Sequence, residues 1–211
     1  MANMVFGEVD WNSADSGASE KGSDFMKLVE GENTVRIMGN PVQFYIHWLD
    51  VPGGGKRKVN SPFEDSELVR RLEDSGFKRQ ARWLVKVLDR RDNSFKLLDV
   101  GPQIYNGIKA LYNNTRWGKV TQYDVTIIKA PKGTQPLYSV TPNPKEAIPS
   151  DLKDKFMAFN ERVNLEKIIA PTPSAEIYGM MSWKQPGGSS GSSKQESTSK
   201  ASDSDFDFDF E

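Results

Sequence analysis

The sequence predicts a mainly β fold in which five strands form a small barrel and helices decorate its outside. Three observations lead to this prediction. Short runs rich in β-branched and aromatic residues recur along the chain, separated by glycine, proline or asparagine. One pair of runs flanks a short polar turn, as in a hairpin. Helical patterns stand between other runs, which fits helices packed around a barrel.

Residues 25–49 predict three successive strands. The segments FMKLVE, TVRIMG and VQFYIHWL contain β-forming residues, and Gly31 and a proline mark the turns between them. In TVRIMG the period of two puts Val35 and Ile37 on one face and Arg36 on the other. We therefore expect Arg36 to face away from the core.

A glycine-rich loop and a helix follow. The loop PGGGKRKVNSP carries three glycines and a run of three cations. The segment EDSELVRRLEDSG predicts a helix, because Leu68 and Leu72 lie four residues apart on one helical face and Gly76 ends the pattern. Asn60 or Ser61 is expected to cap this helix, and its leucines should dock it onto the sheet.

The clearest prediction is a hairpin formed by residues 82–89 and 94–100 around a polar turn. A helix should follow, with Gly101 and Pro102 at its start. Two more strands, QYDVTIIKA and PLYSVT, and a last helix over about residues 150–165 complete the pattern. These elements fit a five-stranded barrel of the OB type, and a plain α+β domain has the same elements.

Composition divides the chain into four expected segments. Residues 25–183 hold the apolar residues that a single folded domain needs. Residues 1–24 should form a flexible arm. Residues 184–202, a linker rich in glycine and serine, and the acidic-aromatic tail 203–211 cannot bury enough apolar surface to offset the entropy of ordering them.

The composition also excludes several kinds of protein. The chain has no cysteine and one histidine, so disulfides and the usual zinc sites cannot be assembled. The glycine run lacks the spacing of a P-loop. Asp89, Asp92 and Asp99 are candidate metal ligands, but hairpin turns commonly carry aspartate for local hydrogen bonds. We therefore expect no catalysis, no cofactor and no metal. No signal peptide or run of about eighteen apolar residues is present, which predicts a soluble intracellular protein.

Charge is distributed unevenly along the chain. Residues 50–132 contain 17 Lys and Arg against 10 Asp and Glu, a net charge of +7. Residues 1–49 contain 3 against 7, a net charge of −4, and residues 184–211 contain 3 against 6, a net charge of −3. A basic middle between acidic ends indicates a polyanionic partner.

Proteins that bind single-stranded nucleic acid need cations for the phosphates and flat rings on which bases stack. The basic region interleaves the two, so it predicts such a protein. Trp83, Tyr112 and Trp117 could instead belong to the core, and the cations at 56–58 to a solvated loop. The candidate binding residues are Arg36, Lys56, Arg57, Lys58, Lys78, Arg79, Arg82, Trp83, Arg90, Arg91, Tyr105, Lys109, Tyr112, Arg116, Trp117 and Lys119.

The terminal sequence SDSDFDFDFE is the most specific feature of the chain. Exposed phenylalanines invite aggregation, so a tail needed only for solubility would not carry three of them. We expect this tail to recruit partner proteins. Because its charges and rings alternate as in a nucleic-acid strand, it should also compete weakly for the basic surface. The expected interaction residues are Asp205, Phe206, Asp207, Phe208, Asp209, Phe210 and Glu211.

Three segments of the chain resemble the helix-destabilising, gene-32-type single-stranded DNA-binding proteins of tailed bacteriophages. They are TVRIMGNP with VQFYIHWL, GFKRQARWLVKVLDR, and SFKLLDVGPQIYNGIKALYNN, and the resemblance runs over about residues 25–159. It implies an OB-fold core and an acidic C-terminal segment that contacts replisome proteins. It also implies phosphate contacts from Arg36, Lys78, Arg79 and Arg82 and a position in the binding groove for Trp83.

The chain departs from this family pattern at two places. The best-known members carry a zinc insertion built from cysteine and histidine, whereas residues 53–82 contain neither. They also have a basic N-terminal arm that drives cooperative binding, whereas residues 1–24 are acidic. The resemblance thus implies a zinc-free variant located in the cytoplasm of the bacterial host, and it leaves self-association on DNA open.

Together these observations predict a non-enzymatic, sequence-independent single-stranded DNA-binding protein for phage DNA replication, recombination and repair. Its tail would recruit a polymerase, helicase, loader or recombinase. Two alternatives remain open. The chain could be a protein-interaction adaptor, or it could be an RNA-binding OB domain, since stacking surfaces accept either sugar.

Overall fold

The computed structural model describes residues 24–185. Nearly all of the expected arm, nearly all of the expected linker and the whole expected tail therefore lie outside the described residues. The strands are β1 (Gly31–Ile37), β2 (Val42–Val51), β3 (Gly55–Asn60), β4 (Gln80–Asp89), β5 (Ser94–Val100), β6 (Tyr123–Lys129) and β7 (Tyr138–Lys145). The helices are α2 (Ser66–Asp74), α3 (Pro102–Tyr112), α4 (Leu152–Arg162), α5 (Leu165–Ile169) and α6 (Ser174–Met180).

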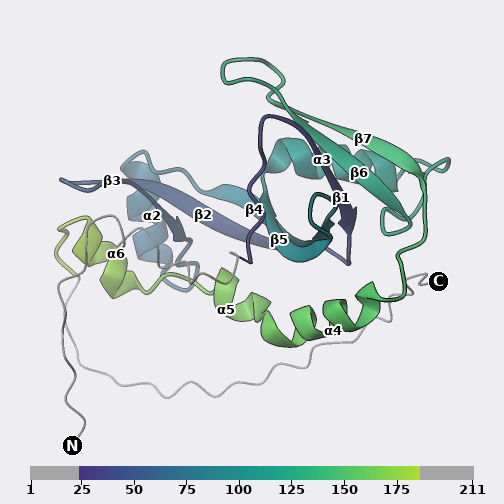
Figure 1. The fold of residues 1–211 in the computed structure, drawn as a ribbon. Helices are drawn as coiled ribbons and strands as arrows, with labels where there is room; N and C mark the ends of the chain where they lie inside the picture. The colour runs from purple at the N-terminus through teal and green to yellow at the C-terminus, as the bar shows by residue number, and fades with distance from the viewer. Residues whose placement is uncertain (1–23, 186–211) are drawn as a thin grey trace, which may run out of the picture.

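The seven described strands form one open antiparallel sheet in the order β3-β2-β4-β1-β6-β7, with β5 paired to β4 (Figure 1). Residues 80–84 of β4 pair with β2 and residues 87–89 pair with β1, while β5 pairs along the opposite edge of β4. Within the described residues no pairing joins β7 to β5 or to β3. The predicted closed five-stranded barrel is therefore wrong, and the OB-type fold is not confirmed.

Helices cover both faces of this sheet. By the period of two, Trp83 and Val85 of β4 lie on one face, which we call the α3 face, and Leu84 and Leu88 lie on the other, the α4 face. Helix α3 packs on the α3 face over Val85 and its neighbours, and α2 and α6 cover the part of the same face near β3. Helices α4 and α5 lie in series over the α4 face (Figure 1).

Several predicted elements are confirmed. The hairpin is β4 with β5, and the last predicted helix is α4. Helix α3 begins at Pro102, where the missing N–H of proline removes no helical hydrogen bond. Gly107 lets this helix approach β7 closely, because a Cβ at that position would lie 2.7 Å from Cγ2 of Val140. The close approach fixes α3 against the sheet.

Other local predictions are wrong. FMKLVE forms an isolated bridge at Phe25 instead of a strand, and the cations of the glycine-rich loop belong to strand β3. Asp65 caps α2, because its side chain accepts a hydrogen bond from the backbone N–H of Leu68 at 2.9 Å. The expected caps are engaged elsewhere: Asn60 donates to backbone carbonyls at the end of α5, and the hydroxyl of Ser61 bonds to the only histidine. Helices α5 and α6 were not predicted.

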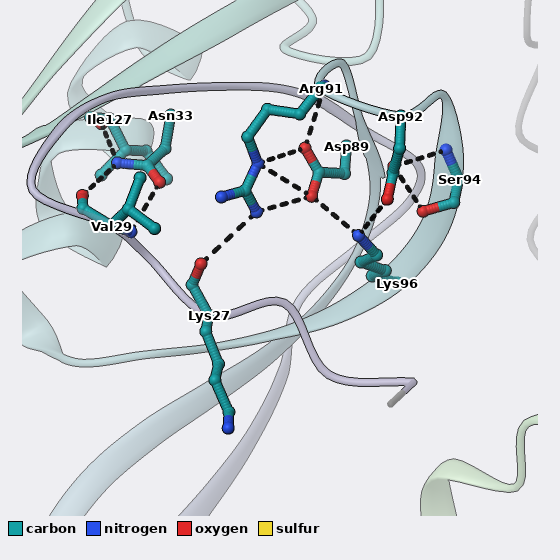
Figure 2. Close-up of polar contacts among 9 residues, drawn as sticks. All are labelled: Lys27, Val29, Asn33, Asp89, Arg91, Asp92, Ser94, Lys96 and Ile127. Atoms are coloured by element: carbon teal, nitrogen blue, oxygen red, sulfur yellow. Dashed lines mark hydrogen bonds and ion pairs between the residues drawn. The ribbon is translucent and has the colours of Figure 1, made fainter. Parts of the chain in front are cut away.

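One buried carboxylate holds the turn of the β4–β5 hairpin. Asp89 is fully buried and accepts hydrogen bonds from Nη2 of Arg91 at 2.7 Å and from Nζ of Lys96 at 3.0 Å (Figure 2). Lys96 also contacts Asp92 at 2.6 Å. Burial alone would raise the pKa of Asp89, but the hydrogen bonds from Arg91 and Lys96 outweigh it and lower the pKa to about 2.

This depressed pKa predicts how stability depends on pH. Because the folded pKa of Asp89 lies below its ordinary value of 3.8, its contribution is present above about pH 4 and is lost as the pH falls towards 2. Asp89→Asn should cost roughly 2 kcal/mol of unfolding free energy at neutral pH and flatten the acid limb of the stability profile. Urea denaturation between pH 2 and pH 7 measures both.

The matched control is Asp92→Asn, which removes the half-exposed carboxylate of the same turn. It should change stability much less, because solvent screens an exposed ion pair. An acid limb that is equally steep in the wild type and in Asp89→Asn would contradict the assigned role of Asp89.

Candidate nucleic-acid interface

On the α3 face, the helices leave a strip of β2 and β4 uncovered. This strip lies between the residues that pack under α2 and those that pack under α3. Tyr45 of β2 stands opposite Ala81 of β4, and Gln43 stands opposite Trp83. Tyr45 is 40% exposed, and the side chain of Gln43 donates to its hydroxyl at 3.0 Å. The strip therefore presents an accessible ring and polar groups rather than a sealed core.

Four rings follow one another along this strip, and we call Tyr45, Trp83, Tyr105 and Tyr112 the aromatic row. Trp83 follows Ala81, the cross-strand partner of Tyr45, two residues along the same face of β4, and its ring stacks on Tyr105 with centroids 4.0 Å apart and planes 3° from parallel. Tyr105 and Tyr112 line one cavity of about 420 Å³, and Tyr112 is 59% exposed. The row thus runs from the middle of the sheet to the mouth of a cavity beside α3.

Cations accompany the aromatic row. The guanidinium of Arg79 lies 5.0 Å from the ring centroid of Tyr45, within the range of a cation–π contact, and 3.7 Å from a carboxylate oxygen of Glu73. Lys109 and Lys119 line the cavity and are exposed. Within the described part of the chain, neither lysine has a carboxylate partner. The strip therefore offers positive charge that the fold itself does not neutralise.

The helical period of α3 places its functional side chains together. Tyr105, Lys109 and Tyr112 stand at positions i, i+4 and i+7, so they share one side of the helix. Ile104 is buried in the core on which the helix packs, and Ile108 borders both this core and the cavity. A single helix thus packs through its isoleucines, exposes Lys109 and Tyr112, and holds the half-buried Tyr105 against Trp83.

A smaller basic group lies on the α4 face beyond α5. Trp48 is 45% exposed and stands opposite Lys58 of β3. Lys58 and Arg82 both contact the carboxylate of Asp99, at 2.9 Å and 2.8 Å. Their positive charge is therefore partly balanced within the protein, and the aromatic row lies on the other face of the sheet.

The structure buries one of the predicted binding cations and engages two others in ion pairs. Arg36 is 1% exposed, and its Nε donates to Asp124 at 2.7 Å. Arg90 donates to the other oxygen of the same carboxylate at 2.9 Å. Arg91 holds the hairpin turn. The expectation that Arg36 faces away from the core is wrong, because the second face of the sheet is also covered. Burial lowers the pKa of Arg36, and pairing with Asp124 opposes this effect.

The other predicted residues have mixed positions. Trp117 is half-buried and packs on the core, its ring centroid lies 5.6 Å from that of Tyr123, and within residues 24–185 no ring contact joins it to the aromatic row. Lys78 and Arg116 are exposed, as are the cations Lys56, Arg57 and Lys58 on the edge strand β3. The structure gathers six of the predicted residues at the strip: Arg79, Trp83, Tyr105, Lys109, Tyr112 and Lys119.

Two exposed rings were missed by the sequence-based prediction. Tyr45 and Trp48 both belong to VQFYIHWL, which was interpreted as an ordinary strand. They lie three residues apart, so they point to opposite faces, and each reaches solvent because the helices leave that part of its face uncovered. The alternation of the strand was visible in the sequence, but the coverage of each face was not.

No other chemistry stands out in residues 24–185. They contain no group of three or more His, Cys, Asp or Glu side chains placed to hold a metal ion. Their helices are all too short or too polar to cross a membrane. The side chain of His47 is buried, with Nδ1 2.7 Å from the carbonyl of Phe77 and Nε2 3.1 Å from the hydroxyl of Ser61, so it links two loops.

Comparison with known proteins gives one informative similarity. No protein-family model matches the chain, and no solved structure matches it. The chain is 23% identical over 151 residues to a probable ssDNA-binding protein of Escherichia phage T5. The matched region covers 62% of this chain and 58% of that protein, so the chain spans less than two thirds of its relative. This distant similarity links the chain to a phage protein of that description and does not confirm the gene-32-type family.

Proposed function

We propose that this protein binds single-stranded DNA without sequence preference along the α3 face of its sheet. Bases stack on the aromatic row, and phosphates pair with Arg79, Lys109 and Lys119. One observation carries the proposal: four rings and three cations from β2, β4, α3 and the flanking loops lie along one strip. The description of the phage T5 relative as a probable ssDNA-binding protein supports the same function.

The strip suits an unpaired strand better than a duplex. Each base that stacks on an aromatic ring contributes about 1–3 kcal/mol, and only unpaired bases expose their flat faces to a protein ring. Three phosphate contacts give a log-log salt slope of roughly −2 for a single strand. Stacking accepts every base, which explains why no sequence preference is expected from the row itself.

The wider role is also a proposal. A protein of this kind would protect single strands during phage DNA replication, recombination and repair inside the host cell. Residues 25–183 would form its binding domain, derived from an OB-type barrel that has opened. The order β4-β5-α3-β6-β7, with β1 paired to both β4 and β6, supports this derivation. Residues 203–211, which lie outside the described residues, would recruit partner proteins.

The rings of the row provide the first test. Tyr45→Ala should weaken binding of a fluorescently labelled dT oligonucleotide by about 1–3 kcal/mol, because one stacking platform is lost. Fluorescence anisotropy measures the affinity, with poly(U) and duplex DNA as competitors. The control is Phe63→Ala, which removes an even more exposed ring outside the row and should leave binding unchanged. Equal affinity for duplex and single strand would contradict the proposal.

The lysines of the cavity provide the second test. The double variant Lys109→Gln and Lys119→Gln should make the log-log salt slope less steep by about 1.4, because two phosphate contacts are lost. The measurement is the same titration at several salt concentrations. Lys153→Gln removes an exposed cation from α4 and should leave the slope as it is. A double variant that keeps the wild-type slope would place the phosphates elsewhere.

The tail provides the third test. Ending the chain after Trp183 should strengthen dT binding about twofold, as expected when a tethered competitor of weak affinity is removed at an effective concentration near 1 mM. It should also abolish the recovery of replication proteins in pull-downs from phage-infected cells. The variant with alanine at Phe206, Phe208 and Phe210 keeps the charges and separates their effect from that of the rings. Unchanged affinity would refute self-competition, and retained recovery would refute recruitment.

A further inference from the structure

The cavity at the end of the aromatic row has an apolar lining that a phosphate-binding groove does not need. Ile37 of β1, Val85 of β4, Ile108 of α3 and Val120 of the loop before β6 line it together. These residues come from four separate parts of the chain, and Tyr105 stands beside them. With about 420 Å³, the cavity falls in the size range of small-ligand sites, roughly 300–1,000 Å³.

The charged groups around this cavity select the kind of ligand. Lys109 and Lys119 are its charged lining residues, and no aspartate or glutamate of residues 24–185 lines it. Asn40, Asn113 and Thr121 add neutral polar groups. A partly apolar interior with two lysines that no described carboxylate pairs favours a ligand that has a flat, largely apolar part next to negative charge. A nucleotide within a single strand has this combination.

We propose that the cavity is a base pocket, which takes one unstacked base of the bound strand and prefers thymine. This inference rests on the proposed function, which it extends from stacking on a row to insertion of a base. Lys109 and Lys119 pair with the phosphates on either side of that base. Tyr105 and Tyr112 flank it, so the base leaves the row without losing contact with aromatic rings.

The preference for thymine follows from the lining. The isoleucine and valine side chains offer no hydrogen bond, so a polar edge placed against this part of the lining loses its bonds to water, whereas an apolar substituent does not. Thymine carries a C5-methyl group, an apolar substituent that uracil and the other DNA bases lack. The pocket therefore favours thymine over uracil, and by this route DNA over RNA.

The experiment compares two labelled oligonucleotides of equal length, one of thymidine and one of deoxyuridine. The two differ only by methyl groups, and every binding register of either one offers the same base to the cavity. The wild type should bind the thymidine strand about fourfold more tightly, the effect of one buried methyl group. Fluorescence anisotropy of the labelled strand measures both affinities without relying on protein tryptophans.

Two variants assign this difference to the cavity. Ile108→Trp places a large ring into it and should reduce the ratio of the two affinities to about one, while the salt dependence of binding persists. Ala110→Trp adds the same ring at an exposed position of α3 outside the lining and should keep the wild-type ratio. Thr121→Trp fills the cavity from another segment and serves if circular dichroism shows that Ile108→Trp does not fold.

The outcomes separate the base pocket from the proposed function. If the wild type binds both strands equally and in a salt-dependent manner, the base pocket is refuted and the proposed function stands. If neither strand binds, both are refuted. If a peptide of residues 203–211 displaces the strands and Ile108→Trp blocks that displacement without changing the affinity ratio, the cavity is a peptide site, and the base pocket is again refuted.

Discussion

The structure depends most on strand β4, which three other strands pair with. Its first half pairs with β2 and its second half with β1, while β5 covers its other edge along most of its length. Because side chains alternate along a strand, β4 supplies both faces of the sheet at once. Val85 and Val87 enter one core, on which the half-buried Trp83 packs, and Leu84 and Leu88 enter another. Each residue of β4 is thereby assigned to a face, and the paired residues of β1, β2 and β5 take the same faces as their partners.

Two covered faces explain why the cations divide into two groups. A charge that the fold buries has to be paired, because desolvation of an isolated ion costs several kcal/mol. Arg36 and Arg90 share Asp124, and Arg91 and Lys96 share Asp89, so these four cations stabilise the sheet and its hairpin turn. Lys109 and Lys119 face the cavity and have no such partner in the described residues. Some cations of the basic region thus stabilise the fold through ion pairs, and others remain available to bind a ligand.

The proposed interface lies where a helix meets a partly covered sheet. Helix α3 is anchored by the buried Ile104 and by the close approach of Gly107 to β7, so Tyr105, Lys109 and Tyr112 are held in place relative to β4. Side chains on fixed elements lose little further freedom when they bind a ligand, which favours affinity. The stack of Trp83 on Tyr105 joins the sheet to this helix and makes the row continuous.

Local patterns in the sequence determined the hairpin, helix α3, helix α4 and most strand positions, because alternation, helical period and turn residues act within a few neighbouring residues. They also placed Trp83, Tyr105, Lys109, Tyr112 and Lys119 among the candidate binding residues. Only the tertiary structure decided that the sheet stays open, that Arg36, Arg90 and Arg91 form ion pairs, and that Tyr45 and Trp48 reach solvent. The physical reason is that alternation states which residues share a face, whereas burial depends on which distant helix covers that face.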